Sequence, residues 1–225
     1  EPIVEMMAGC FPGKQIWFDN DANAAAWGEY LAGGGRGADS MIAVTLGTGV
    51  GGGIILGGKL WNGVNYGAGE LGHMVIDQNG PECNCGRRGC FEALASATAL
   101  IRQTREAMDN APKSLMWELC GGDKRMADGK TVFEAAGRGD RTAAMVVERY
   151  ISYLAVGITN LVNLFQPEII CIGGGVSLAG AALLEPLKQI VAAGDYARDS
   201  SVRTEIRLAE LGNDAGLIGA ALLGR

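Results

Sequence analysis

The chain has 225 residues, of which 48% are hydrophobic and 20% charged, a balance typical of a globular protein and not of a disordered or fibrous one. Its 19 Lys and Arg against 25 Asp and Glu give a formal net charge of −6, so no uniform basic field is available to hold a nucleic-acid backbone. No apolar run reaches the roughly 20 residues of a membrane span. The uncharged, largely apolar stretch 169–184 is interrupted by four glycines and a serine.

The start of the chain and its cysteines indicate origin and compartment. The chain opens at Glu1 with neither an initiator methionine nor a leader, and we therefore expect a fragment or a processed chain. Six cysteines are too few for a disulfide scaffold, and three of them crowd between residues 83 and 90, which suits a metal site in a reducing compartment. We expect a cytoplasmic protein.

The first half of the chain predicts a β-meander beside a helix. Fifteen of the 36 glycines lie between residues 33 and 72, which indicates that backbone approaches something closely there. The expected elements, in chain order, are a strand at 15–19, a helix at 21–31 with an acidic first turn, buried strands at 41–46 and 53–56 flanking a glycine-rich turn, and a hairpin at 57–58 leading into 59–61.

The second half turns helical and then alternates strands with helices. From 140 to 165, apolar residues step by four and three, which predicts one long helix with a continuous core-facing stripe. The other expected elements are a helix at 91–108, a helix opened by a capping box at Thr131 and Glu134, strands at 168–172 and 203–208, a helix to about 193, and a helix at 214–223. This order predicts an α/β domain with a mixed sheet.

Four soft metal ligands are grouped between residues 73 and 90. They are one imidazole and three thiolates, the set that tetrahedral zinc prefers: His73, Cys83, Cys85 and Cys90. Four protein ligands leave no open position, so the spacing favours a structural zinc that pins the loop 70–92 over a catalytic zinc. The alternative is three free buried thiols and an unrelated histidine, against which stand the tight turn at 86–89 and the stiffening Pro81.

Two glycine-rich turns are candidates for contact with phosphate or nucleotide. In the first, at 46–53, backbone amides can turn toward phosphate oxygens and Thr48 can add a hydroxyl donor. This turn is neither a Walker A loop nor a dinucleotide-binding fingerprint, and a plain tight hairpin is its alternative. The second, Gly173, Gly174 and Gly175, follows a strand, and a sterically tight strand-to-helix turn explains it about as well.

Polar residues at the start of the first predicted helix suggest a cleft. Asp21 could act as a general base toward a hydroxyl group, and Asn20 offers both a donor and an acceptor to a sugar. The alternative is that Asp21 only caps the helix. Glu70 and Glu92 flank the cysteine cluster and could accept hydrogen bonds from sugar hydroxyls, held still by the metal, although most carboxylates are simply solvated.

Five motifs occur in a fixed order: DNDANAA at 19–25, LGTGVGGG at 46–53, AGELGH at 68–73, CNCGRRGCFE at 83–92 and IGGGVS at 172–177. Together they resemble the ROK family of sugar kinases and sugar-responsive repressors, and most closely its bacterial glucokinases. The resemblance covers nearly the whole chain from about residue 15. It implies an actin-like, ribonuclease H-like ATPase fold, in which sugar and ATP bind in a cleft between two lobes.

The resemblance also implies roles for the motif residues. Asp21 would be the base for the sugar 6-hydroxyl, and the sugar ligands would be Asn20, Glu70, His73 and Glu92. The ATP phosphates would meet Gly47, Thr48 and Gly49, and Gly173, Gly174 and Gly175 would lie beside the adenosine. His73 would serve twice, with one ring nitrogen on zinc and the other toward the sugar.

The activity implied is phosphorylation of glucose at its 6-hydroxyl with ATP and Mg²⁺, by a homodimer. The kinases of the family carry an Asp-x-Gly-x-Thr phosphate motif near the N-terminus, and this sequence has none. We therefore expect a single C-terminal lobe, weakly active or inactive by itself. Its parts would be 15–93 with the sugar, phosphate and zinc motifs, a helical and dimer-forming 94–165, and a β-α-β-α unit at 166–225.

Two alternatives stay open. The chain could be the effector domain of a ROK repressor, which would keep the zinc cluster and the sugar ligands beside a DNA-binding domain located elsewhere. The kinase is favoured because Asp21 and the whole glycine loop are intact. A purely structural zinc domain would explain the cysteines only. Among hexoses glucose is favoured, while mannose, allose or an N-acetylated sugar would need only small changes in the pocket.

Overall fold

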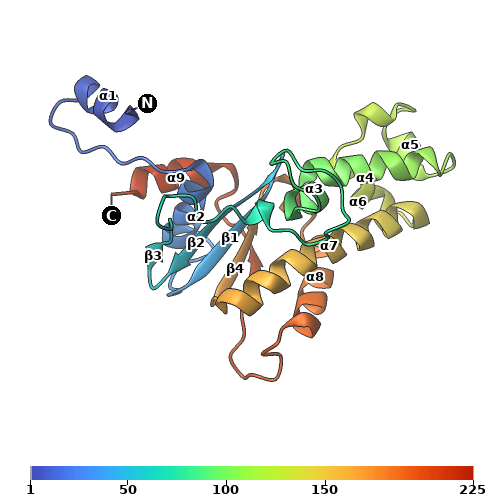
Figure 1. Ribbon diagram of the computed structural model, residues 1–225. Helices are drawn as coiled ribbons and strands as arrows, with labels where there is room; N and C mark the ends of the chain where they lie inside the picture. The colour runs from blue at the N-terminus through green and yellow to red at the C-terminus, as the bar shows by residue number, and fades with distance from the viewer. Residues whose placement is uncertain (1, 225) are drawn as a thin grey trace.

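The computed structural model describes residues 2–224 and is built around one five-stranded sheet with helices on both faces (Figure 1). Its strand order is β3-β2-β1-β4-β5. β1 pairs antiparallel with β2 and parallel with β4, so the predicted mixed sheet is confirmed. The strands are β1 (Met41–Leu46), β2 (Val50–Leu56), β3 (Lys59–Leu60), β4 (Ile169–Gly173) and β5 (Glu205–Leu208).

The helices divide between the two faces (Figure 1). α2 and α9 cover one face, and α3, α7 and α8 lie on the other, where α4, α5 and α6 extend the helical layer. Among the described residues, no helix is both long and apolar enough to cross a bilayer. The helices are α1 (Ile3–Cys10), α2 (Asp21–Ala32), α3 (Phe91–Ala95), α4 (Ala97–Asp109), α5 (Leu115–Leu119), α6 (Gly129–Gly137), α7 (Arg141–Phe165), α8 (Ala181–Gly194) and α9 (Ala215–Leu222).

The alternation of side chains along β1 builds two separate cores. Ile42, Val44 and Leu46 belong to the large core under α7 and α8, whereas Met41 and Ala43 belong to the smaller one under α2. All five are buried, because a central strand presents successive side chains to opposite faces. The predicted long helix is confirmed as α7, whose stripe from Ile151 to Leu161 is buried in the large core.

α2 and α9 cross where small residues let their backbones touch. A Cβ atom on Gly28 would lie 2.3 Å from the carbonyl oxygen of Ala215, and one on Gly219 would lie 1.6 Å from that of Ala24. No L side chain fits either contact. The crossing holds α2 in place, and α2 begins at Asp21.

Three local predictions are wrong. Residues 15–19 form no strand, because this extended segment has no neighbouring strand to pair with and leaves Trp17 and Phe18 at least half exposed. The helix predicted at 91–108 is two helices, broken at Ser96, whose extended backbone and side chain cap α4. The capping box of α6 joins Asp128 to Thr131, and so the helix begins earlier than Thr131 and Glu134 indicated.

Other boundaries differ by less. β2 starts at Val50, so the glycines at 51–53 are part of a strand and the turn shrinks to 47–49. The segment after Gly175 begins as a 3-10 turn, Gly175–Ala179, before α8. α1 and α5 have no counterpart in the prediction, and α1 buries none of its residues.

Candidate functional site

Four of the motifs meet around one cavity at the C-terminal end of β1. The cavity has a volume of about 430 Å³. Its lining includes both residues at the start of α2, the glycine turn and two carboxylates, namely Asn20, Asp21, Gly47, Gly49, Glu70 and Glu92. Thr48 lies between the two glycines on the same turn and is exposed. Residues up to 72 positions apart in the sequence thus share one hollow.

Asn20, and not Asp21, caps α2. The Asn20 Oδ1 atom accepts hydrogen bonds from the backbone amides of Ala22 at 2.8 Å and Asn23 at 3.4 Å. Asp21 is the first helical residue, and its exposed carboxylate accepts only from the adjacent Ala22 amide, at 2.9 Å, among the contacts that the structure describes. The capping role that competed with a chemical role for Asp21 is therefore filled by its neighbour.

The turn at 47–49 joins β1 to β2 and is tied to the start of α4. The Gly47 amide donates to the Gly49 carbonyl at 3.0 Å, while the Gly47 carbonyl accepts from the Ala97 amide at 2.9 Å. The Thr98 hydroxyl donates to the Thr48 carbonyl at 2.8 Å. Because the Gly47 amide is used inside the turn, Thr48 and Gly49 are the better-placed donors to an anion.

The remaining glycines of this motif have a packing role. Cβ atoms on Gly52 and Gly53 would lie 2.3 Å from Leu71 Cδ1 and 2.4 Å from Ala26 Cβ. These two glycines therefore let α2 and the segment after Glu70 approach β2. The sequence predicts that backbone approaches another group closely in this segment. At these two positions that group is a side chain of the protein itself.

Glu92 connects the turn with the cysteine loop. Its Oε2 atom accepts a hydrogen bond from the Val50 amide at 3.1 Å. A Cβ atom on Gly49 would lie 2.1 Å from that same oxygen, so a larger residue at position 49 would displace the carboxylate. Glu92 sits in the first turn of α3, directly after Cys90 and Phe91.

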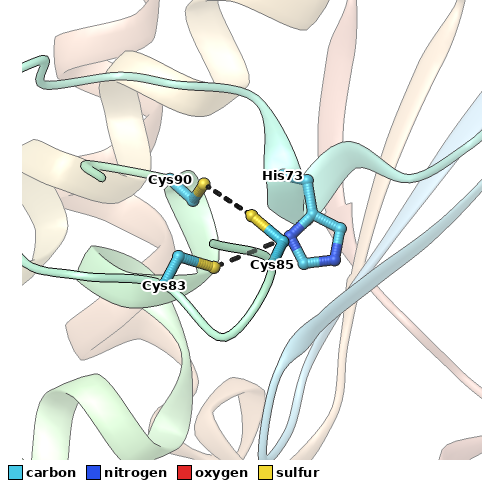
Figure 2. A group of neighbouring side chains, drawn as sticks. All are labelled: His73, Cys83, Cys85 and Cys90. Atoms are coloured by element: carbon cyan, nitrogen blue, oxygen red, sulfur yellow. Dashed lines mark hydrogen bonds between the residues drawn. The ribbon is translucent and has the colours of Figure 1, made fainter. Parts of the chain in front are cut away.

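The four predicted metal ligands come together as a cluster (Figure 2). Their ligand atoms, His73 Nδ1 and the three Sγ atoms, all lie within 4.8 Å of one another. Cys83 Sγ is 3.7 Å from His73 Nδ1, and Cys85 Sγ is 3.6 Å from Cys90 Sγ. Ligands of a tetrahedral zinc at about 2.3 Å for sulfur stand about 3.7 Å apart, so these residues fit a zinc-sized ion.

The Nε2 atom of His73, on the opposite edge of the ring from Nδ1, points to a carboxylate. His73 Nε2 lies 3.9 Å from Glu70 Oε2, while Nδ1 faces Cys83. The Arg87 guanidinium donates to the His73 carbonyl, and hydrogen bonds from Arg87 lower the pKa of the Cys85 thiol to about 6. Burial raises the pKa of Cys90 to about 12, which a bound cation would counteract.

One residue of the triple glycine lines a second cavity, beside the start of α4. Gly174 has φ of +86°, and a Cβ atom there would lie 2.4 Å from the Leu46 carbonyl oxygen, which is why glycine is required. Gly175 lines a mostly apolar cavity of about 530 Å³, together with Ala97 and Phe133. Sequence reasoning missed Phe133, for which no local signal exists.

Comparisons with known proteins agree with this arrangement. The sequence profile of the ROK family matches residues 3–225. The glucokinase of Thermotoga maritima is 46% identical over 210 residues, which are 93% of this chain and 65% of that protein. The chain therefore spans slightly less than two thirds of this relative.

Solved structures of the family have the same fold. A ROK glucokinase from Streptomyces griseus, crystallised with glucose and AMPPNP, superposes with a TM-score of 0.88 at 37% identity, covering 99% of this chain and 72% of that one. A ROK transcriptional regulator, a homologue of the Escherichia coli MLC protein, superposes with a TM-score of 0.81 at 28% identity, covering 98% of this chain and 54% of that one. The predicted resemblance and actin-like ATPase fold are confirmed, and the chain belongs to the ROK family.

Proposed function

We propose that this chain is the sugar-binding lobe of an ATP-dependent glucokinase, which phosphorylates glucose at its 6-hydroxyl. The observation that carries the proposal is the single cavity in which Asp21, Glu70 and Glu92 meet the glycine turn. The similarity to the Thermotoga maritima glucokinase supports glucose as the sugar and ATP as the phosphoryl donor. The Streptomyces griseus complex with glucose and AMPPNP supports both as well.

Asp21 would be the general base. Its carboxylate is exposed to the cavity and is free of the helix cap, so it can accept the proton of the 6-hydroxyl as that oxygen attacks the γ-phosphate. The amides of Thr48 and Gly49 would donate to phosphate oxygens, and bound Mg²⁺ would neutralise further charge. Positioning and charge stabilisation account for most of phosphoryl transfer, and both need a rigid frame.

The remaining sugar hydroxyls would be held by side chains that are free to donate or accept. The Asn20 oxygen is occupied by the helix cap, which leaves its Nδ2 group as a donor to the sugar. Glu70, His73 Nε2 and Glu92 would complete the ring of contacts. Gly173, Gly174 and Gly175, with the apolar cavity beside Phe133, would receive the adenosine.

The cluster His73, Cys83, Cys85 and Cys90 would hold a structural zinc ion. The ion would supply no chemistry to the transfer, since four protein ligands fill its coordination sphere. Its role would be to fix the loop 70–92 and thus the orientation of the His73 ring toward the sugar.

The cellular location, the oligomeric state and the division of the chain into parts belong to the same proposal. A cytoplasmic location suits the free cysteines at the cluster. Homodimerisation through 94–165 is supported by apolar side chains that α7 leaves exposed, among them Met145 and Leu164. We also propose that the chain divides into a motif-bearing part at 15–93, a helical part at 94–165 and a β-α-β-α part at 166–225.

Two assays test the proposal. Titration calorimetry of this chain with glucose, mannose and N-acetylmannosamine measures which sugar binds. A coupled assay of glucose 6-phosphate formation is run on this chain and on the product of the complete reading frame that encodes it. We expect glucose binding in the first assay, and turnover by the complete product well above that of this chain. A complete product that binds glucose and a DNA operator but never turns over ATP would establish the repressor alternative.

A further inference from the structure

Three polar side chains form a closed ring of hydrogen bonds, and two of them flank Asn20 and Asp21 in the sequence. Asn23 Nδ2 donates to Asp19 Oδ1 at 2.7 Å and to Asn62 Oδ1 at 3.3 Å. Asn62 Nδ2 donates to Asp19 Oδ2 at 3.2 Å and so closes the ring. The members come from two parts of the chain 39 or more residues apart, the start of α2 and the loop that follows β3.

The ring is partly shielded from solvent and carries a negative charge. Asn23 is only 4% exposed, and Asp19 and Asn62 are half-buried. Within residues 2–224, no lysine or arginine pairs with Asp19, so its carboxylate is stabilised by N–H donors: the two asparagine amides and the Asn20 backbone amide at 2.7 Å. Charge-assisted hydrogen bonds of this kind are stronger and more directional than neutral ones.

The ring joins the two halves of the sugar site. On one side, Asp19 holds the Asn20 amide and so sets the start of α2. On the other side, Asn62 opens the loop that leads to Glu70, and its carbonyl closes this loop by accepting from the Ala68 amide at 3.1 Å. The far end of the loop is fixed by Leu71, which packs against Gly52. The Asn62 side chain therefore links the start of α2, which carries Asp21, to the loop that carries Glu70.

We propose that Asn62, acting through Asp19 and Asn23, is a positioning residue that holds the Glu70 loop at the correct distance from Asn20 and Asp21. None of the three residues needs to touch the reacting atoms. The role rests on the proposed function, because it assigns Glu70 and Asp21 to the same sugar.

A swap of the ring partners tests this role. In Asn62→Asp, two carboxylates face each other and one donor is lost. In Asp19→Asn, one acceptor oxygen is replaced by an NH₂ donor, so the Asn23 and Asn62 amides compete for the single oxygen that is left at position 19. In the double variant Asp19→Asn/Asn62→Asp, the donor and the acceptor exchange places, so every link of the ring can form again with the same net charge. Asn65→Asp is the matched control, because Asn65 is an exposed residue of the same loop whose Oδ1 only accepts from the Gly67 amide.

Three readouts are measured on the complete reading-frame product: hydrogen exchange over 61–70, the KM values for glucose and ATP with kcat, and the melting temperature. We expect Asn62→Asp to speed exchange over 61–70, to raise the glucose KM about ten- to a hundredfold with a fall in kcat, and to leave the ATP KM unchanged. We expect the double variant to recover most of both effects, and Asn65→Asp to match the unaltered protein.

Each of the other possible results would contradict one part of the proposal. Faster exchange and a lower melting temperature, with unchanged glucose KM and kcat per folded molecule, would make the ring purely structural. A double variant no better than the single ones would rule out the ring itself. If the unaltered protein neither binds nor phosphorylates a sugar, the proposed function fails, and the positioning role fails with it, whereas the exchange data still report on the ring.

Discussion

The Glu92 carboxylate accepts a hydrogen bond from the Val50 amide at 3.1 Å and lies where a Cβ atom on Gly49 would have to stand. One side chain proposed for the sugar thus rests directly on the turn proposed for the phosphates. Because α3 starts one residue after Cys90, the position of Glu92 also depends on the cysteine cluster. The sites proposed for sugar, phosphate and metal are therefore mechanically joined at this residue.

Replacing Glu92 with alanine should weaken the binding of both glucose and ATP. Loss of a charged hydrogen-bond acceptor predicts a rise of about ten- to a hundredfold in the glucose KM. The freed Val50 amide would loosen the turn, so the ATP KM should also rise and should no longer depend on glucose concentration. Kinetics of the complete product at a matrix of the two concentrations measure this. Glu118→Ala on α5 is a surface control, and an unaltered ATP KM in the Glu92 variant would contradict the coupling.

Removing the metal should disorder the sugar site without removing any catalytic group. We expect about one zinc ion per chain by elemental mass spectrometry, as a four-ligand structural site predicts. Chelation, or Cys83→Ser, should lower the melting temperature and weaken glucose binding about ten- to a hundredfold, because His73 loses its orienting ligand. Cys10→Ser, at an exposed cysteine outside the cluster, should retain the metal. Metal-free protein with undiminished glucose affinity would refute this role.

The α2–α9 crossing should tolerate no added methyl group. Gly219→Ala would force a Cβ atom to within 1.6 Å of the Ala24 carbonyl oxygen, so the free energy of unfolding should fall by about 3 kcal/mol. Gly216→Ala lies on the same helix with nothing within 4 Å of its Cβ position, and should stabilise by about 0.5 to 1 kcal/mol. Urea denaturation of both variants compares them. Equal stabilities would show that the crossing is not tightly packed.

Acid should weaken the helical part through Asp140. Burial by itself would raise the pKa of Asp140, but hydrogen bonds from the Ala143 amide, the Ser114 hydroxyl and the Leu115 amide outweigh it, and its pKa lies below the ordinary value. A depressed carboxyl pKa stabilises the fold above the unfolded-state pKa of about 4 and loses that contribution as the pH falls through the folded-state value.

Asp140→Asn should therefore lower stability at pH 7 and flatten the decline of stability below about pH 4. Chemical denaturation from pH 7 to pH 3 measures both. A variant whose stability falls as steeply with acid as that of the unaltered protein would show that Asp140 is not responsible. Asp199→Asn, at an exposed residue, is the control.

Features encoded by short stretches were predictable from sequence. β1 and α7 follow from unbroken apolar patterns, and the metal cluster follows from four ligands within 18 positions. The start of α2 was also predicted, although the capping residue proved to be Asn20. The break at Ser96 was not foreseen, because both flanking segments are good helix formers and the break depends on one capping side chain.

Features that depend on distant partners were not predictable. The segment 15–19 has the composition of a strand but no strand beside it. The ring of Asp19, Asn23 and Asn62 joins residues whose proximity only the folded chain creates, although two of them stand inside the DNDANAA motif. Likewise, the packing role of Gly52 and Gly53 emerges only once α2 and Leu71 are seen against β2.

The central claim is that Asp21 is the base for phosphoryl transfer to a sugar bound in this lobe. Asp21→Asn keeps the shape of the side chain and removes its basicity. In the complete product, we expect kcat for glucose phosphorylation to fall about 10²- to 10⁴-fold while calorimetry shows glucose bound within a few-fold of its normal affinity. Near-normal turnover by Asp21→Asn would contradict the account, because the account assigns the proton of the 6-hydroxyl to this carboxylate.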